Sequence, residues 1–121
     1  MNHVCHAPHC TRQVPPHMLM CRSCWFALPP KIRSAIWREY RPGQESDKRP
    51  SFRYLAVQRL ACAHSVFKPH DEKAVLEVFP YLAEAVSYAK KAIEAGLGDP
   101  LEGLVPAEWP VAREKIAGDG R

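Results

Sequence analysis

The strongest constraint on this chain is a group of four cysteines within twenty residues, Cys5, Cys10, Cys21 and Cys24. They form two close pairs, with four residues inside the first pair, ten between the pairs and two inside the second. A tetrahedral Zn²⁺ ion takes four such soft ligands, and two pairs joined by a loop supply them with little backbone strain. The spacing therefore predicts one structural zinc ion per chain. Four protein ligands leave no open position for water or substrate, so we expect no zinc catalysis.

The first cysteine pair leaves the identity of one ligand open. Its gap is wider than usual, and His9 follows Cys5 with three residues between them, a spacing common among zinc ligands. We expect Cys10 to be the ligand, with His9 as the alternative. Two other interpretations are buried apolar cysteines and a redox dithiol at Cys21 and Cys24. The dithiol lacks the βαβ context that is typical of that motif.

The compartment expected from the sequence agrees with metal binding. The chain opens without a secretory signal pattern and has no run of roughly 18–20 apolar residues. We therefore expect a protein of the cytoplasm, with no membrane contact. In a reducing compartment, clustered cysteines indicate metal ligation and not disulfides.

Apolar spacing beyond the cysteines predicts a mainly α-helical fold, in which an N-terminal zinc knuckle with little strand precedes three to four short helices. Twelve prolines in 121 residues favour short, separated elements. We expect a short strand over residues 17–20, helices over 30–40, 51–67 and 80–95, and a capped turn over 71–76. Ser51 should cap the second helix, Pro80 should begin the last one and Gly96 should end it.

The expected organisation is one compact domain in three parts. Residues 1–43 hold the zinc knuckle and the first helix, residues 44–97 hold a helical region packed on it, and residues 98–121 form a loosely structured C-terminal tail. A polar linker over 42–50 joins the first two parts. The tail is expected to dock locally through Leu104 and Trp109.

Charge is unevenly distributed along the chain. Residues 1–70 carry eleven basic and three acidic side chains, whereas residues 71–121 carry six and ten. Cations are close together on the helix over 30–40 and on residues 1–24, which we call the metal loop. This arrangement indicates either a surface that tracks phosphates or an ordinary solvated face. The candidate partner or nucleic-acid contacts are Arg22, Lys31, Arg33, Trp37, Arg38 and Arg41, with Arg12 as an extension.

Several other side chains have alternative interpretations. The aromatic residues Trp25, Phe26, Trp37 and Tyr40 are expected in the core, with exposure of Trp37 for a partner as the alternative. Arg59 falls within an apolar helix stripe, so it should reach solvent or pair with an acidic residue of the last helix. Cys62 is expected to be a packed helix residue and not a nucleophile.

The first third of the chain resembles small proteins of bacteriophages and prophages. They share C-x4-C, a Pro-Pro turn, C-x2-[HC]-W-F, a Leu-Pro, and a helix ending in W-x2-Y-R-P-G-Q. The matching positions here are Cys5, Cys10, Pro15, Pro16, Cys21, Cys24, Trp25, Phe26, Leu28, Pro29, Trp37, Tyr40, Arg41, Pro42, Gly43 and Gln44. The fourth ligand position in that family is often histidine, so the resemblance implies metal chemistry at Cys24. It implies a mobile-element origin and no particular activity.

These observations predict a binding module and not an enzyme, with no small-molecule substrate. The preferred partner is a host protein, for example an antiviral-defence factor, which the module would inhibit. The alternative is a nucleic-acid-binding transcriptional regulator that uses the basic helix beside the zinc site. An acidic second half would repel a nucleic-acid backbone, which favours the protein partner.

Overall fold

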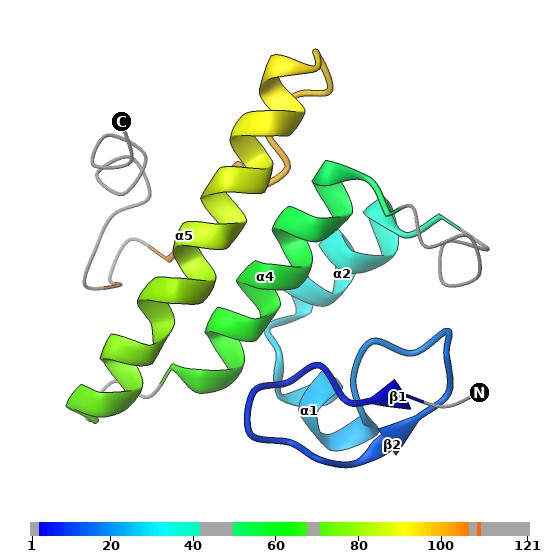
Figure 1. Cartoon of the computed structure of the whole chain (residues 1–121), viewed down its shortest axis with the longest axis vertical. Coiled ribbons are helices and arrows are strands. Elements are labelled where there is room, and N and C mark those ends of the chain that lie inside the picture. Colours follow the sequence, from blue (N-terminus) through cyan, green and yellow to red (C-terminus); the bar gives the residue numbers. More distant parts are fainter. Residues whose placement is uncertain (1–2, 42–49, 68–70, 107–108, 110–121) are drawn as a thin grey trace.

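The computed structural model describes residues 3–41, 50–67, 71–106 and 109, and within them the fold is mainly helical. Two short strands and a one-turn helix form an N-terminal unit, defined here as residues 3–28, and three longer helices follow it (Figure 1). In chain order the elements are β1 (His3–Val4), β2 (Gln13–Val14), α1 (Arg22–Ala27), α2 (Pro30–Glu39), α4 (Phe52–Val66) and α5 (Glu72–Glu94). The expected fold class is therefore confirmed.

Helix α4 is the central element of the core. It begins where Ser51 accepts a hydrogen bond from the Tyr54 N–H at 3.1 Å, which confirms the expected cap. Nine of its fifteen residues are buried, because α5 packs along one side and α2 along another (Figure 1). Alanines at the helix contacts, such as Ala56, Ala85 and Ala89, have no exposed surface, so α4 and α5 approach closely.

Helix α5 differs from the prediction, because it is one continuous helix and Pro80 lies inside it. Proline removes one backbone hydrogen bond and normally interrupts a helix. Here Val78 and Leu82, on either side of Pro80, are both buried in the core, so packing holds the helix together through the break. Asp71 does cap the start, since its carboxylate accepts from the Lys73 N–H at 3.0 Å.

The C-terminal end of α5 follows the sequence prediction. Gly96 has a φ of +78°, a left-handed conformation that glycine adopts without steric cost. The Gly96 N–H donates to the Ile93 carbonyl at 3.0 Å, and the Leu97 N–H donates to the Ala92 carbonyl at 2.9 Å. These two bonds form a Schellman motif, which turns the chain back toward α2 and α4.

The segment after α5, residues 97–106 and 109, packs on the helices. Leu101 is 1% exposed, and Leu104 and Trp109 are also buried, which confirms the expected local docking. Trp109 packs against Phe67 and His64 at the end of α4, with ring centroids 5.3 and 4.7 Å apart. The remainder of the expected tail, 107–108 and 110–121, and most of the expected linker, 42–49, lie outside the described residues.

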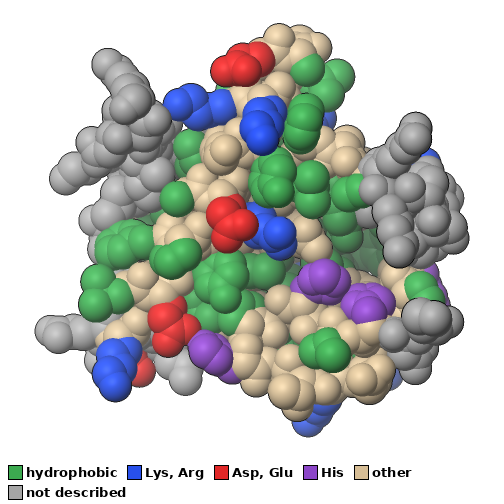
Figure 2. All heavy atoms as spheres, viewed as in Figure 1, with side chains coloured by type: hydrophobic (Ala, Val, Ile, Leu, Met, Phe, Trp, Pro, Cys, Tyr) green, Lys and Arg blue, Asp and Glu red, His purple; other side chains and the backbone are tan. Residues whose placement is uncertain are grey.

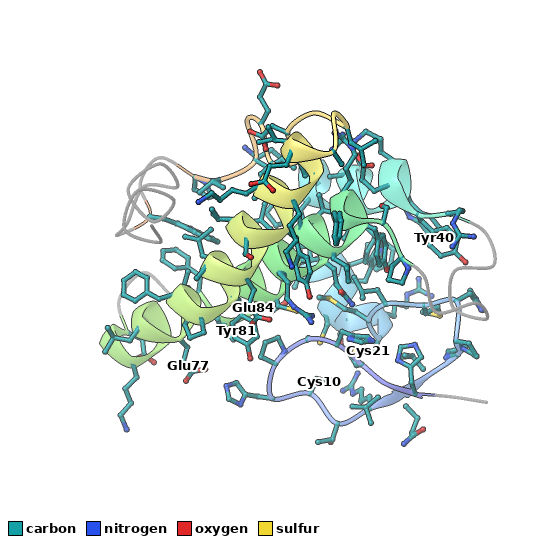
Figure 3. The ribbon with its side chains drawn as sticks, turned by 45° about the horizontal axis from the view of Figure 1, so that its top comes forward. Cys10, Cys21, Tyr40, Glu77, Tyr81 and Glu84 are labelled. Carbon is teal, nitrogen blue, oxygen red and sulfur yellow. The ribbon has the colours of Figure 1, made fainter. Side chains whose placement is uncertain are left out.

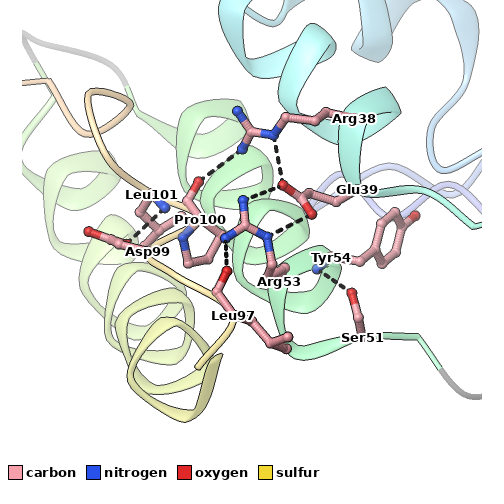
Figure 4. A network of polar contacts seen from close by, with 9 residues as sticks. All are labelled: Arg38, Glu39, Ser51, Arg53, Tyr54, Leu97, Asp99, Pro100 and Leu101. Carbon is pink, nitrogen blue, oxygen red and sulfur yellow. Dashed lines mark hydrogen bonds and ion pairs between the residues drawn. The ribbon is translucent and has the colours of Figure 1, made fainter. Parts of the chain in front are cut away.

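An ion-pair network joins α2, α4 and the segment after α5 (Figure 4). The Glu39 carboxylate accepts two hydrogen bonds from Arg53, at 2.8 and 2.9 Å, and one from Arg38 at 2.7 Å. The same two guanidinium groups donate to backbone carbonyls of the segment, Arg53 to Leu97 at 2.6 Å and Arg38 to Pro100 at 3.2 Å. The network therefore fixes where the chain runs after α5.

The N-terminal unit has two strands, but not where the sequence predicted one. β1 pairs with β2 in antiparallel register, with His3 opposite Val14, while residues 17–20 form no strand. A turn over residues 15–18, closed by a hydrogen bond from the Met18 N–H to the Pro15 carbonyl, occupies the first half of this segment. Leu19 and Met20 then point into the core, so their apolar character reflects burial in a loop and not strand pairing.

Candidate metal site and the adjacent aromatic surface

The four cysteines of the N-terminal unit converge on one point. Their Sγ atoms all lie within 4.8 Å of one another, and the Sγ atoms of Cys10 and Cys21 are 3.9 Å apart. Two sulfur atoms bound to one tetrahedral zinc at about 2.3 Å would lie about 3.8 Å apart. All five cysteines of the chain are free thiols. The cluster is therefore compatible with a single metal ion bound by Cys5, Cys10, Cys21 and Cys24.

A tight turn explains the wide gap in the first cysteine pair. The Cys10 N–H donates to the Ala7 carbonyl at 3.1 Å, with Pro8 and His9 between them. His9 has a φ of +68°, so proline followed by a left-handed residue gives the pattern of a type II turn. This turn brings Cys10 back to the cluster.

The second cysteine pair starts helix α1. Cys21 is the N-cap residue, and its N–H donates to the Cys5 Sγ at 3.2 Å. The Ser23 hydroxyl and the Cys24 backbone N–H form hydrogen bonds to the Cys21 sulfur, and these lower the pKa of Cys21 to about 6. The two-residue gap thus directs the Cys24 backbone N–H at the Cys21 sulfur. Burial raises the pKa of Cys5 and of Cys24.

His9, the alternative ligand, points away from the cysteines. Its Nε2 atom lies 2.6 Å from the Glu77 Oε2 atom of α5, and its side chain is 74% exposed. Figure 3 shows Cys10 and Cys21 in the N-terminal unit and Glu77 on α5. The structure brings Cys10 into the cluster and uses His9 as a contact between the N-terminal unit and α5.

Further polar contacts attach the N-terminal unit to the helices. The Cys62 thiol of α4 donates to the His6 carbonyl at 3.4 Å, and the Gln58 side chain lies 3.5 Å from the His6 ring. Histidine side chains gather on this unit in the view of Figure 2. Cys62 is buried, and desolvation raises its pKa to about 11, so at neutral pH it is a thiol. It is a packed residue, as predicted.

Arg59 also has the partner that its position required. Its Nε atom lies 3.1 Å from the Glu84 Oε2 atom of α5. The ion pair confirms that this cation in an apolar stripe pairs with an acidic residue of the last helix.

The predicted basic surface is not one stripe. Lys31 donates to the Gly103 carbonyl at 3.3 Å, and Arg38 belongs to the Glu39 network, so both cations contact this chain's own segment after α5. Arg22 and Arg33 lie elsewhere, with their guanidinium carbons 5.8 and 5.2 Å from the centre of the Phe26 ring.

The last two predicted cations, Arg12 and Arg41, also lie apart from each other. Arg12 donates to the Ser23 hydroxyl at 3.0 Å, and Arg41 is exposed beyond the end of α2. The intrachain contacts of Lys31 and Arg38 could not be read from the sequence, because Gly103 and Pro100 lie more than sixty positions away.

The sequence predicted that the aromatic residues around α2 lie in the core, and this prediction is wrong for two of the four. Trp37 is 60% exposed and Phe26 is 58% exposed, whereas Trp25 and Tyr40 are partly buried. Trp37 therefore lies at the surface, which is the exposure that the alternative interpretation of this residue requires. Helix α2 buries Ile32, Ala35 and Ile36, and the aromatic rings lie on the side turned toward the metal loop.

A shallow pocket lies beside Trp37, between the metal loop, α2 and the start of α4. We call it the aromatic groove, and its lining residues are His17, Met18, Leu19, Trp25, Ile36, Trp37, Tyr40 and Tyr54. Sequence reasoning missed Met18, Leu19 and Tyr54 as parts of this surface. Nothing local in the sequence places Tyr54 next to Tyr40, because the two residues belong to different helices.

No protein family, curated protein or solved structure matches this chain. Among the described residues, no helix combines the length and apolar character needed to cross a membrane.

Proposed function

We propose that this protein is a non-catalytic, zinc-folded binding module of the phage type that docks on a host protein. An antiviral-defence factor is one class of target that would fit such a role. The observation that carries the proposal is an exposed aromatic surface, centred on Trp37, that is lined in part by residues 17–19 between the two pairs of clustered cysteines.

The donor set supports zinc as the metal. Four sulfur ligands in a tetrahedral arrangement suit zinc or iron, and zinc is the usual ion of small structural sites. The N-terminal unit buries only a few large apolar side chains, among them Val14, Met20 and Leu28. Metal binding would therefore contribute much of the free energy that folds this unit.

A structural role and not catalysis follows from the number of ligands. Four thiolates fill a tetrahedral coordination sphere, so no position is left for water or substrate. The fifth cysteine, Cys62, is buried and carries a raised pKa, which makes it a poor nucleophile.

The exposed aromatic side chains support a protein partner. Tryptophan is enriched among the residues that dominate binding energy at protein interfaces. A nucleic-acid partner has less support, because Lys31 and Arg38, two of the cations expected to contact phosphates, donate to backbone carbonyls of this chain.

The experiment is affinity capture from a nuclease-treated bacterial lysate, using the full chain and two variants. Trp37→Ala removes the exposed ring of α2, and Leu76→Ala is the matched control, since Leu76 is 62% exposed on α5. We expect a protein partner that the wild type and Leu76→Ala capture equally and that Trp37→Ala loses. A partner that disappears on nuclease treatment, or one that all three proteins capture equally, would overturn the proposal.

A further inference from the structure

Four aromatic rings form a continuous ladder along the aromatic groove. The ring centroids of Trp25 and Trp37 are 6.1 Å apart, those of Trp37 and Tyr40 are 5.7 Å apart, and those of Tyr40 and Tyr54 are 6.3 Å apart. Each ring is steeply tilted to the next, with interplanar angles of 77°, 82° and 61°. Because neighbouring rings are steeply tilted, they do not form a flat slot between parallel planes. They line the concave surface of the groove, which we also call the cup.

The size of the groove limits what it can hold. Its volume is about 90 Å³, and Met18, Leu19 and Ile36 complete an apolar lining. A cavity of roughly 150 Å³ holds one benzene molecule. The groove is smaller, so a single aliphatic side chain or a prolyl ring is enough to fill it.

The part of the chain that supplies most of the groove is positively charged. Residues 1–41 contain six Lys and Arg side chains and one carboxylate, that of Glu39. The Glu39 side chain is 9% exposed and is held by Arg38 and Arg53. A zinc ion with four thiolates would subtract two charges and leave the balance positive. Figure 3 shows Tyr40 on one side of the fold and the α5 carboxylates Glu77 and Glu84 on the other.

Two cations, Arg22 of α1 and Arg33 of α2, lie together at the surface. Arg22 and Arg33 both contact the ring of Phe26, which is 58% exposed. Guanidinium groups held against an aromatic ring keep their charge and are preordered for a carboxylate. Arg33 lies one helical turn before Trp37 on α2. Arg22 contacts the same Phe26 ring as Arg33, so an acidic partner would find these two cations near the apolar cup.

From these observations we propose that the aromatic groove receives one aliphatic side chain of an acidic peptide segment of the protein partner. The inference rests on the proposed function and specifies the chemistry of its ligand. The aliphatic side chain enters the cup and covers Trp37, while Asp or Glu residues next to it face Arg22 and Arg33. The aromatic anchor determines the affinity, and the charges mainly determine the association rate.

The experiment is a selection of displayed random peptides on the zinc-loaded full chain, followed by affinity measurements on the enriched peptides. We expect one aliphatic residue flanked by Asp and Glu. Trp37→Ala should weaken binding of such a peptide by about 30-fold or more, while Leu76→Ala should not change it. Arg22→Glu, on an exposed side chain outside the cup, should slow association and reduce its salt dependence. Circular dichroism and zinc content will show that each variant is folded.

Several results would overturn the inference. These are the absence of any enriched peptide, enrichment of basic peptides, or equal affinity of the wild type and Trp37→Ala. If Trp37→Ala does not fold, an unchanged association rate for Arg22→Glu has the same consequence. Tight, Trp37-dependent binding of a single-stranded oligothymidylate would assign the surface to nucleic acid instead.

The selection also separates this inference from the proposed function. If lysate capture yields a Trp37-dependent protein but the selected peptides are not acidic, the binding module stands and its ligand chemistry is different. If acidic peptides bind at Trp37 but the chain as first purified, before zinc loading, contains no zinc, the zinc-folded module is wrong and the groove assignment stands.

Discussion

The Glu39 network gives the sharpest prediction on stability. Glu39→Gln keeps the shape of the side chain but removes its charge and turns one acceptor oxygen into a donor that faces guanidinium N–H groups. Three charge-assisted hydrogen bonds end on this carboxylate, two from Arg53 and one from Arg38. The Glu39 and Arg53 side chains are only 9% and 24% exposed, whereas Arg38 is 52% exposed.

The magnitude follows from these exposures. A hydrogen bond to a charged group contributes about 1.5–3 kcal/mol when it is shielded from water, and an exposed ion pair contributes about 0–1 kcal/mol. We count the Arg53 pair as partly shielded and the Arg38 pair as exposed. Glu39→Gln should therefore lower the free energy of unfolding by about 2–3 kcal/mol at pH 7.

The stability difference between wild type and Glu39→Gln should depend on pH. Hydrogen bonds from Arg53 hold the pKa of Glu39 below its usual 4.5. A lowered folded-state pKa contributes stability that is present above the unfolded pKa and is lost as the pH falls through the folded one. The difference between wild type and Glu39→Gln should thus be full at pH 7 and shrink below about pH 4.5.

The assay is urea unfolding followed by circular dichroism over this pH range. Glu84→Gln is the control, because Glu84 pairs with Arg59 and is 50% exposed. It should cost less than about 1 kcal/mol. Equal stability of wild type and Glu39→Gln at pH 7, or a difference that persists unchanged at low pH, would refute the reasoning.

Two further substitutions test the packing. Pro80→Ala restores the N–H that α5 lacks at an exposed position, so it should raise the unfolding free energy by about 1–3 kcal/mol in the same urea titration; a loss of stability would mean that proline is required there. Leu101→Ala removes a side chain that is 1% exposed and should cost about 2–5 kcal/mol by thermal unfolding, whereas a cost below about 1 kcal/mol would show that the segment after α5 is not part of the core.

Local features of this chain could be predicted from the sequence because their physical cause is local. Ser51 supplies a cap oxygen three residues before the N–H that it binds, and Gly96 is placed where the chain needs a positive φ. The cysteine pairs likewise carry their own turns. The rule for Pro80 failed because burial of Val78 and Leu82 outweighs one missing hydrogen bond.

Long-range contacts could not be predicted in this way. Lys31 and Arg38 looked like solvent-facing cations, but their acceptors belong to a segment far along the chain. The aromatic groove has the same origin, because Trp37 and Tyr54 come together only when α2 packs on α4. Periodicity indicates which face of a helix is apolar, and it does not indicate which neighbour will cover that face.

We propose that Cys5, Cys10, Cys21 and Cys24 bind one zinc ion and that this ion folds the N-terminal unit. Native mass spectrometry of the freshly purified wild type, Cys10→Ser and His9→Ala tests it most directly, since the mass identifies both the metal and its stoichiometry. We expect one zinc per chain in the wild type and in His9→Ala, and loss of zinc or strongly weakened binding in Cys10→Ser. A wild-type chain without stoichiometric zinc, or zinc that is lost in His9→Ala and retained in Cys10→Ser, would contradict it.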